Sequence, residues 1–481
     1  MLLRLEMSQK LRAESLALCI CTPRTDVLFN LWTHGTDLDN LTAPKRMTIV
    51  LQMSTENIVN LEVIVPHDGM KGKNMVRGVR IATLATLWLI PIVIFVLALR
   101  SDWVTTWRPL RVPFPISQFV DLYTIPSGLE TLHKGGDPLV ANPAELLHRP
   151  MNYPRVWLYL FSAASINRGN ASTVGLLFCA FYLTCMSFLI AQTEHAIDAL
   201  IILLASLSVA PLHGMERGNN DLFVFSIVFL ACIVTNNYLK SGLFAAAVLL
   251  KLFPIAGMIM DTIRRPQKWR VLAALLTGLV ILLVLLQWRD LILISRGTPV
   301  APFLSYGVVS LKHEFLFQMF QWGFVYAPGW IVIAECWLAG AFVIAIAWRS
   351  SQKLEISIQN SKLAELFSVF GGTYVFTYAV GGNWAYRLIF LLPTLPLAFE
   401  IARSSKHRVW GIVYIILVGL AENTAGFELS GGTIVGHAAT FTLFLMLLTM
   451  LTRLNTNFLG APYLSRDSLA TEVHNELQTA K

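Results

Sequence analysis

Long apolar runs divide the chain from about residue 79 onward. A helix needs about 20 apolar residues to cross roughly 30 Å of hydrocarbon, and none of these runs alternates as the strands of a barrel do. We therefore expect an all-α polytopic membrane protein with about 11–12 transmembrane helices. The candidate spans cover residues 79–99, 154–168, 171–191, 196–212, 221–237, 240–261, 270–288, 328–348, 363–381, 386–401, 408–423 and 432–452.

Composition agrees with this pattern. The 481 residues are 55% hydrophobic and only 14% charged, where a soluble domain has roughly a quarter charged residues. The net charge of +8 does not predict a nucleic-acid partner, because Lys and Arg in a membrane protein mostly mark cytoplasmic loops. Four of the six cysteines lie in apolar segments, and Cys19 and Cys21 lack a second ligand pair, so we expect no metal site.

The basic loops predict the orientation of the chain. Residues 264–270 (RRPQKWR), 348–353 and 403–408 suit the cytoplasm, which leaves both termini inside and the loop 100–153 outside. Counting every span then places residues 213–221 on the cytoplasmic side. However, the segment 154–168 is short, and the segment 240–261 contains a lysine and a proline, so either one could be broken or re-entrant and move residues 213–221 outside.

The two ends differ from the spans between them. Residues 1–74 are aperiodic and carry no hydrophobic pattern able to build a core. They form either a small cytoplasmic extension or a stretch upstream of a true start at Met70 or Met75, and we favour the second. The main domain covers residues 75–455, and residues 456–481 form a cytoplasmic tail.

The first outer loop has the composition of a structured segment. We expect Trp103 and Trp107 at the headgroup level, and two short amphipathic helices between Phe119 and Gly136, separated at Pro126 and Gly128. Asp121 opens this stretch. It is either a helix-start carboxylate favoured by the helix dipole or a general base for a sugar hydroxyl.

The connection HGMERGNNDLFVF, residues 213–225, places five polar side chains within six residues. Arg217 offers a planar set of donors for phosphate. Asn219, Asn220 and Asp221 open a helix, whose free N–H groups form an anion site. The alternative is an ordinary polar turn with an N-cap, which explains one polar residue but not five.

Further candidates are spread along the chain. Lys251 could snorkel, line a cavity or pair with an acid, whereas Arg387 is an arginine at an outer helix end, where positive-inside logic disfavours it. Asp137 is explained as a turn residue. We find no phosphate-binding loop or dinucleotide fingerprint and expect no cofactor.

Four features of the chain resemble the GT-C glycosyltransferases and, among them, the family 87 mannosyltransferase-like proteins. A first span precedes an outer loop with the acidic segment DLY, and GGDPL leads to NYPRVWLYLF. ERGNND is then followed one helix later by LLKLFP, and NWAYRLIFLLPTLP resembles the family's late helix. The chain departs from the family pattern at Leu139, Arg155 and Asn219.

The resemblance implies an inverting transferase that moves a mannose-like hexose from a polyprenyl-phosphate sugar to a glycan or glycolipid acceptor. It implies a bacterial-type plasma membrane and an active site on the outer face. The general base would be Asp121. Substrate-binding candidates are Tyr123, Tyr153, Arg155, Glu216, Arg217, Asn219, Asn220, Asp221, Lys251, His313, Asn383, Tyr386 and Arg387.

A transporter or flippase of lipid-linked sugars is the alternative, with the broken helix at Lys251–Pro254 as its gate. A non-catalytic scaffold leaves the clustered polar residues unexplained. The structured first loop with its acid, and the absence of obvious inverted repeats, favour the enzyme.

Overall fold

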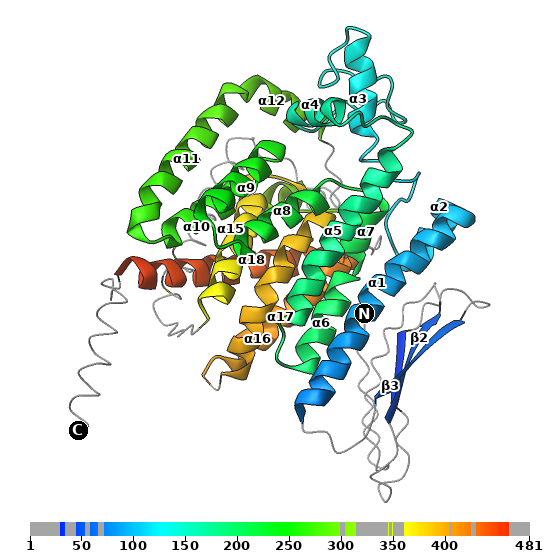
Figure 1. Ribbon diagram of the computed structural model, residues 1–481, viewed down its shortest axis with the longest axis vertical. Helices are drawn as coiled ribbons and strands as arrows, with labels where there is room; N and C mark the ends of the chain where they lie inside the picture. Colours follow the sequence, from blue (N-terminus) through cyan, green and yellow to red (C-terminus); the bar gives the residue numbers. More distant parts are fainter. Residues whose placement is uncertain are drawn as a thin grey trace, which may run out of the picture.

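The structure is a computed structural model, and it describes residues 29–33, 45–52, 58–65, 72–298, 304–313, 345, 349, 360–404, 406–424 and 430–460. Helices dominate (Figure 1). The longer helices are α1 (Gly72–Arg100), α5 (Ala171–Ala191), α6 (Ala196–Ser206), α8 (Asp221–Ile233), α9 (Asn237–Leu250), α11 (Gln267–Leu286), α15 (Ser361–Val380), α17 (Arg408–Thr424) and α18 (Ser430–Gly460). The shorter ones are α2 (Trp103–Trp107), η1 (Arg108–Leu110), α3 (Thr124–His133), α4 (Val156–Ala163), α7 (Val209–Glu216), α10 (Ile255–Arg264), α12 (Trp288–Gly297), η3 (Ala385–Thr394) and α16 (Leu395–Arg403).

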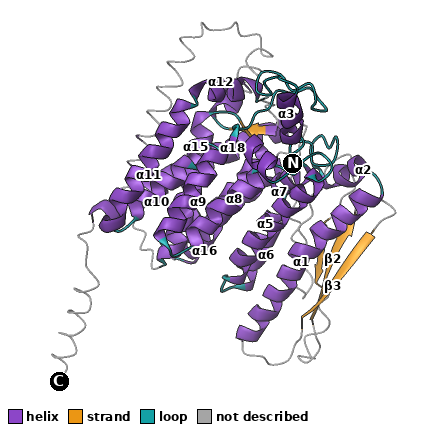
Figure 2. Cartoon of the chain, turned by 45° about the horizontal axis from the view of Figure 1, so that its top comes forward, coloured by secondary structure: helices purple, strands orange, loops and turns teal. Residues whose placement is uncertain are grey.

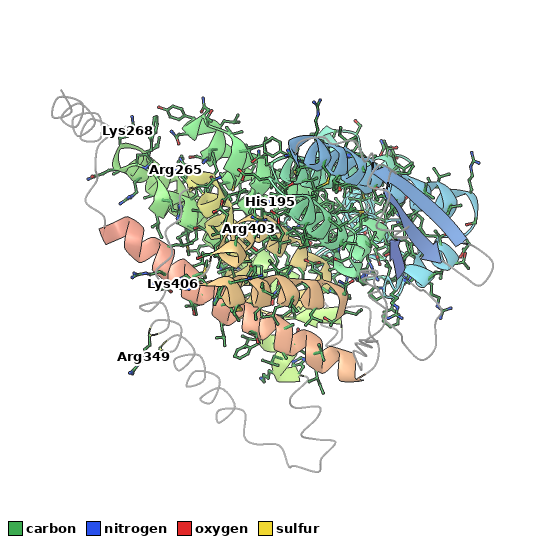
Figure 3. All side chains as sticks on the ribbon, turned by 90° about the horizontal axis from the view of Figure 1, so that it is seen from below. His195, Arg265, Lys268, Arg349, Arg403 and Lys406 are labelled. Atoms are coloured by element: carbon green, nitrogen blue, oxygen red, sulfur yellow. The ribbon has the colours of Figure 1, made fainter. Side chains whose placement is uncertain are left out.

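The helices run between two ends of the bundle. At the first, which we call the loop end, lie α2, α3, α7 and α12, and Figure 2 brings this end forward. The opposite end, which we call the basic end, carries the labelled residues of Figure 3, among them His195, Arg265, Lys268, Arg403 and Lys406. This distribution follows the predicted cytoplasmic loops, because Lys and Arg concentrate on that side of a membrane.

The protein is an integral, multi-pass, all-α membrane protein. Within the described residues, six helices are long and apolar enough to span a bilayer, and a seventh span results if α6 and α7, bent by 46°, count as one. We expected 11–12 spans. The difference arises because α8, α9 and α10 have only 13, 14 and 10 residues, α17 has 17, and the predicted span 328–348, apart from residue 345, lies outside the described residues.

The prediction that residues 154–168 span the membrane is wrong. Only an eight-residue helix forms there, α4, which is far too short to cross. Its Trp157 indole donates to the carbonyl of Leu250 at the end of α9, over 3.0 Å. The first loop therefore extends from Ser101 to Asn170, and with one crossing fewer, residues 213–221 lie at the same end as Asp121.

The segment 240–261, predicted either as one span or as a broken segment, is broken, and it forms a hairpin of two short helices. Lys240 near the start of α9 lies 3.6 Å from Asp261 near the end of α10, so the two helices run up and back. They break at Lys251, whose backbone is extended, and Pro254 caps α10. Proline cannot donate the backbone hydrogen bond that a continuous helix requires at that point.

The first loop packs inward more than its sequence predicts. Trp103 and Trp107 are 8% and 0% exposed, in an aromatic cluster with Phe95, and their predicted position at the headgroup level stays a prediction. Instead of two amphipathic helices, one helix, α3, includes Pro126 and Gly128, and seven of its ten residues are buried. Proline is tolerated because it falls in the first turn.

Outside the bundle, residues 29–65 contain an antiparallel sheet of order β1-β2-β3, from Phe29–Thr33, Lys45–Gln52 and Ile58–Val65. Its register pairs Phe29 with Leu51 and Lys45 with Val65. The aperiodic pattern of the first 74 residues did not predict these strands. At the other end of the chain, α18 continues to Gly460, past the expected boundary at 455.

Candidate functional site

Asp121 lies at the loop end, two residues before the N-cap of α3, and its side chain meets three donors. Its Oδ1 accepts from Arg217 Nη1 over 3.2 Å and from Arg149 Nη1 over 3.3 Å. Its Oδ2 accepts from Asn219 Nδ2 over 2.9 Å. The residue is 7% exposed. It is therefore a nearly buried carboxylate held by side chains from two distant segments.

These partners keep Asp121 ionised. Burial alone would raise the pKa of its carboxyl, because a low-dielectric surrounding disfavours the charge. The charges of Arg217 and Arg149 and the hydrogen bond from Asn219 outweigh this effect, so the pKa lies below its usual value. Arg149 also pairs with Glu145, over 2.6 Å, which fixes its guanidinium beside the pocket.

Arg217 follows the last residue of α7, and all three nitrogens of its guanidinium donate hydrogen bonds. Besides Asp121, its Nε donates to His213 Nε2 over 3.1 Å, and its Nη2 donates to the carbonyl of Phe114 over 3.2 Å. The Trp384 ring lies 5.9 Å from the guanidinium carbon, within the range of a cation–π contact. Such a forked set of contacts is one that lysine could not reproduce.

Glu216 precedes Arg217 and is fully buried. Its Oε1 accepts from the Trp103 indole over 2.8 Å, and its Oε2 lies 3.6 Å from Arg217 Nε. Its backbone carbonyl accepts from the N–H of Phe119 over 3.3 Å. Glu216 therefore ties the first loop to the end of α7.

A second charged group surrounds Asp221, the first residue of α8. Its Oδ1 lies 2.7 Å from Lys251 Nζ, and its Oδ2 accepts from Arg387 Nε over 3.0 Å. Asn383 accepts from the same guanidinium, and the Tyr153 ring lies 4.8 Å from Lys251 Nζ. One carboxylate thus faces two cations, the buried Lys251 and the partly buried Arg387, and neutralises only one of the two positive charges.

A pocket opens at the loop end beside Asp121. It is small in this structure, with a volume of about 10 Å³, room for about one water molecule. Trp384 and Tyr386 form one wall, with ring planes within 6° of parallel and centroids 6.1 Å apart. The complete lining consists of Asp121, Thr124, Arg149, Pro150, Asn152, Gly297, Trp384 and Tyr386. A cation, a carboxylate and two aromatic faces therefore share one cavity.

Most of the candidates from the sequence lie together at this end, although they are far apart in the chain. They are Asp121, Tyr153, Glu216, Arg217, Asn219, Asn220, Asp221, Lys251, Asn383, Tyr386 and Arg387. The condition that residues 213–221 share a side with Asp121 is met.

Three other candidates have different surroundings. The Tyr123 hydroxyl lies 3.0 Å from Ser172 Oγ on α5. Arg155 pairs with Asp137 over 2.9 Å and with Asp290 over 2.8 Å, and so fastens α12 to the first loop. His313 is exposed. None of the three lines the pocket described above.

Sequence reasoning missed Arg149, His213 and Trp384. Arg149 lies in a stretch whose hydrophobic pattern assigns it no face, and Trp384 was noted only as part of the NWAYR motif. His213 had a usable signal, because it precedes Arg217 by four residues and so shares its helix face. Its Nδ1 and both polar atoms of the Asn220 side chain are buried without a hydrogen-bond partner.

Comparisons of the chain with protein-family models, with curated proteins and with solved structures find no match. Within the described residues, no three His, Cys, Asp or Glu side chains are grouped so that they could hold a metal ion. A function is therefore inferred from the geometry of the site.

Proposed function

We propose that this protein is an inverting membrane glycosyltransferase that moves a mannose-like hexose from a polyprenyl-phosphate sugar to a glycan or glycolipid acceptor at the outer face of the membrane. One observation carries the proposal: an ionised carboxylate lines an open pocket with two aromatic rings, next to a buried group with a surplus positive charge. Base, sugar surface and phosphate site are the parts that such a transfer needs.

Asp121 is the general base. It accepts the proton of the acceptor hydroxyl as that oxygen bonds to the anomeric carbon. The bond from the anomeric carbon to the phosphate oxygen breaks at the same time, and the polyprenyl phosphate leaves with the electron pair. Attack from the face opposite the leaving phosphate inverts the anomeric centre.

Lys251 and Arg387 bind the phosphate, a role that sequence reasoning gave first to Arg217. The reason is charge balance. Asp221 neutralises only one of the two cations, and a buried charge without a counter-ion is costly. A phosphodiester carries one negative charge and supplies the missing one. Stabilising the charge that develops on the leaving phosphate is typically the largest contribution to such catalysis.

Arg217 and Arg149 hold Asp121 in place before the substrate binds. A lowered pKa makes Asp121 a weak base in the empty site. Its carboxylate is nevertheless ionised, as a general base must be, and it accepts the proton as the acceptor oxygen bonds to the anomeric carbon.

Trp384 and Tyr386 form the sugar wall of the pocket. Aromatic rings offer a large apolar face, and the tyrosine hydroxyl adds a polar group. The two parallel rings suit the flat apolar faces of a hexose. The unpartnered Asn220 amide is available for a hydroxyl group nearby.

The test is a transfer assay with the purified protein in vesicles. Radiolabelled polyprenyl-phosphate mannose is supplied together with a short mannoside acceptor, and the products are separated by chain length. A new glycosidic product that depends on the protein supports the enzyme. Movement of the labelled lipid to the other leaflet without any product would support the flippase alternative and contradict the proposal.

A further inference from the structure

Phe119 lies two residues before Asp121 in a conformation that bulky residues avoid. Its φ is +51°, in the left-handed region, where a Cβ atom meets the neighbouring carbonyl. The residue is fully buried nonetheless. A strained residue persists only where its surroundings over-determine it, and such residues cluster at functional sites.

The surroundings of the Phe119 ring include two glycines from different segments. A Cβ at Gly175 of α5 would lie 2.6 Å from Phe119 Cδ2, and one at Gly218 would lie 2.7 Å from Phe119 Cδ1. Real Cβ contacts are essentially never shorter than 3.0 Å. The two edges of the Phe119 ring therefore occupy the space that side chains at Gly175 and Gly218 would need. The Trp103 ring covers it edge-on, with centroids 5.3 Å apart.

Gly218 stands between the two residues of its segment that bind Asp121. Arg217 before it donates to Asp121 Oδ1, and Asn219 after it donates to Asp121 Oδ2. The ring of Phe119 thus packs against Gly218, and the residues on either side of Gly218 both donate hydrogen bonds to the Asp121 carboxylate. A shift of the ring would change both bonds.

The backbone of Phe119 makes the same connection. Its N–H donates to the carbonyl of Glu216, and its carbonyl accepts from Leu122 and Tyr123 on the far side of Asp121. Asp121 is therefore enclosed in a turn that begins at Phe119. This turn is attached to the end of α7 by both a backbone bond and a ring contact.

We propose that Phe119, seated between Gly175 and Gly218, is the positioning residue of the carboxylate: it sets where Asp121 stands relative to Arg217 and Asn219. This role deepens the proposed function and rests on it for its catalytic consequence. Phe119 does not touch the substrate. A displacement of about 1 Å at a catalytic group can cost about 10²-fold in rate, so a shift of this ring should appear in kcat more than in KM.

Gly175→Ala tests the proposal directly. Gly175 is a helical residue without a positive φ, so alanine changes only the space available to the ring. We expect kcat for sugar transfer to fall by about 10²-fold while the KM for the donor changes little. The double variant Gly175→Ala/Phe119→Leu, with a smaller side chain, should recover most of the loss. Gly278→Ala is the matched control, because a Cβ there meets nothing within 4 Å.

A second readout does not depend on activity. A carbodiimide labels carboxyl groups, and mass spectrometry compares Asp121 with the more exposed Asp137 in the same sample. We expect labelling of Asp121 to rise severalfold in Gly175→Ala and to return toward the wild-type value in the double variant. If Gly175→Ala does not fold, Phe119→Leu alone should show the same rise, because it loosens the ring without a clash.

The outcomes separate the two proposals. Unchanged labelling and unchanged kcat in Gly175→Ala and Phe119→Leu would overturn the positioning role. Equal losses in Gly278→Ala would also overturn it, since the effect would then not be specific to the ring. If labelling responds as expected but the wild-type protein transfers no sugar, the positioning role stands and the proposed function fails.

Discussion

Asp221 Oδ1 lies 2.7 Å from Lys251 Nζ, which joins the first residue of α8 to the break between α9 and α10. The contact explains why the chain tolerates a lysine inside an apolar segment. The contact also agrees with the break between the helices. α9 ends at Lys251, whose backbone is extended, and from this position its side chain reaches Asp221. A residue that the sequence marks as costly is thus part of the candidate site.

Lys251→Met should weaken donor binding. A hydrogen bond to a charged group contributes about 1.5–3 kcal/mol, so we expect the KM for the donor to rise by about 10–100-fold, with a smaller change in kcat. Lys240→Met is the control, because Lys240 is also buried and paired with an aspartate, but at the basic end. The measurement is initial transfer rate against donor concentration. Equal effects of both variants would assign Lys251 to stability alone.

Asp121→Asn should abolish transfer. Loss of a general base typically costs about 10²–10⁴-fold in rate. Because Arg217 is buried and would lose its closest carboxylate, we also expect a loss of about 1–3 kcal/mol in stability. Asp198→Asn is the control, because it removes an ion pair with Arg403 at the opposite end, away from the candidate site. Melting temperature and transfer rate should both fall in the first variant, and transfer per folded molecule should survive in the second.

The pH dependence of the reaction follows from the lowered pKa of Asp121. The folded pKa lies below the unfolded value of about 3.9, so the ion pairs of Asp121 stabilise the protein above that pH and are lost as the pH falls through the folded pKa. The acid side of kcat/KM should therefore stay flat down to about pH 5.

Arg149→Ala removes one of the two guanidinium groups that lower this pKa. The acid limb of the pH–rate profile should then move to higher pH, while Arg155→Ala, at the pair with Asp290, should leave it in place. An acid limb that does not respond to Arg149→Ala would mean that another group controls the reaction.

Single cysteines test the orientation of the chain. Val140 is exposed in the first loop, and Ser404 is exposed at the basic end. In sealed vesicles, a thiol reagent that cannot cross the bilayer should label Val140→Cys and Ser404→Cys from opposite sides. Labelling of both from the same side would contradict the predicted orientation.

The long spans could be predicted from sequence because about 20 consecutive apolar residues rarely occur outside a membrane helix. Residues 171–191, for example, match α5 at both ends. For residues 240–261 the sequence left two interpretations open, a single span and a segment broken at its lysine and proline, and the structure confirms the second. Hydropathy records that a segment avoids water, but it does not distinguish one crossing helix from a hairpin of two short ones.

The site was predictable where polar residues stood out against an apolar background, as at Arg217 and Lys251. Which residues pair with which could not be predicted, because Asp121 and Arg217 are 96 positions apart and no local pattern encodes that distance. For this reason phosphate binding is proposed for Lys251 and Arg387, whereas the sequence pointed to Arg217. Arg217 is already engaged by Asp121, whereas Asp221 leaves one cation unbalanced.

The shortness of α8 and α9 has a consequence for depth in the bilayer. At about 1.5 Å per residue, their 13 and 14 residues reach about 20 Å, against roughly 30 Å of hydrocarbon. Both begin or end near the basic end, where Lys240 pairs with Glu365. With the basic ends of these helices set at one edge of the hydrocarbon, Asp221 and Lys251 would lie about 10 Å inside its opposite edge, roughly two thirds of the way along the acyl chains of that leaflet. A lipid-borne substrate would reach these charges laterally, in the plane of the bilayer. A water-soluble one would reach them from the aqueous phase, along the membrane normal.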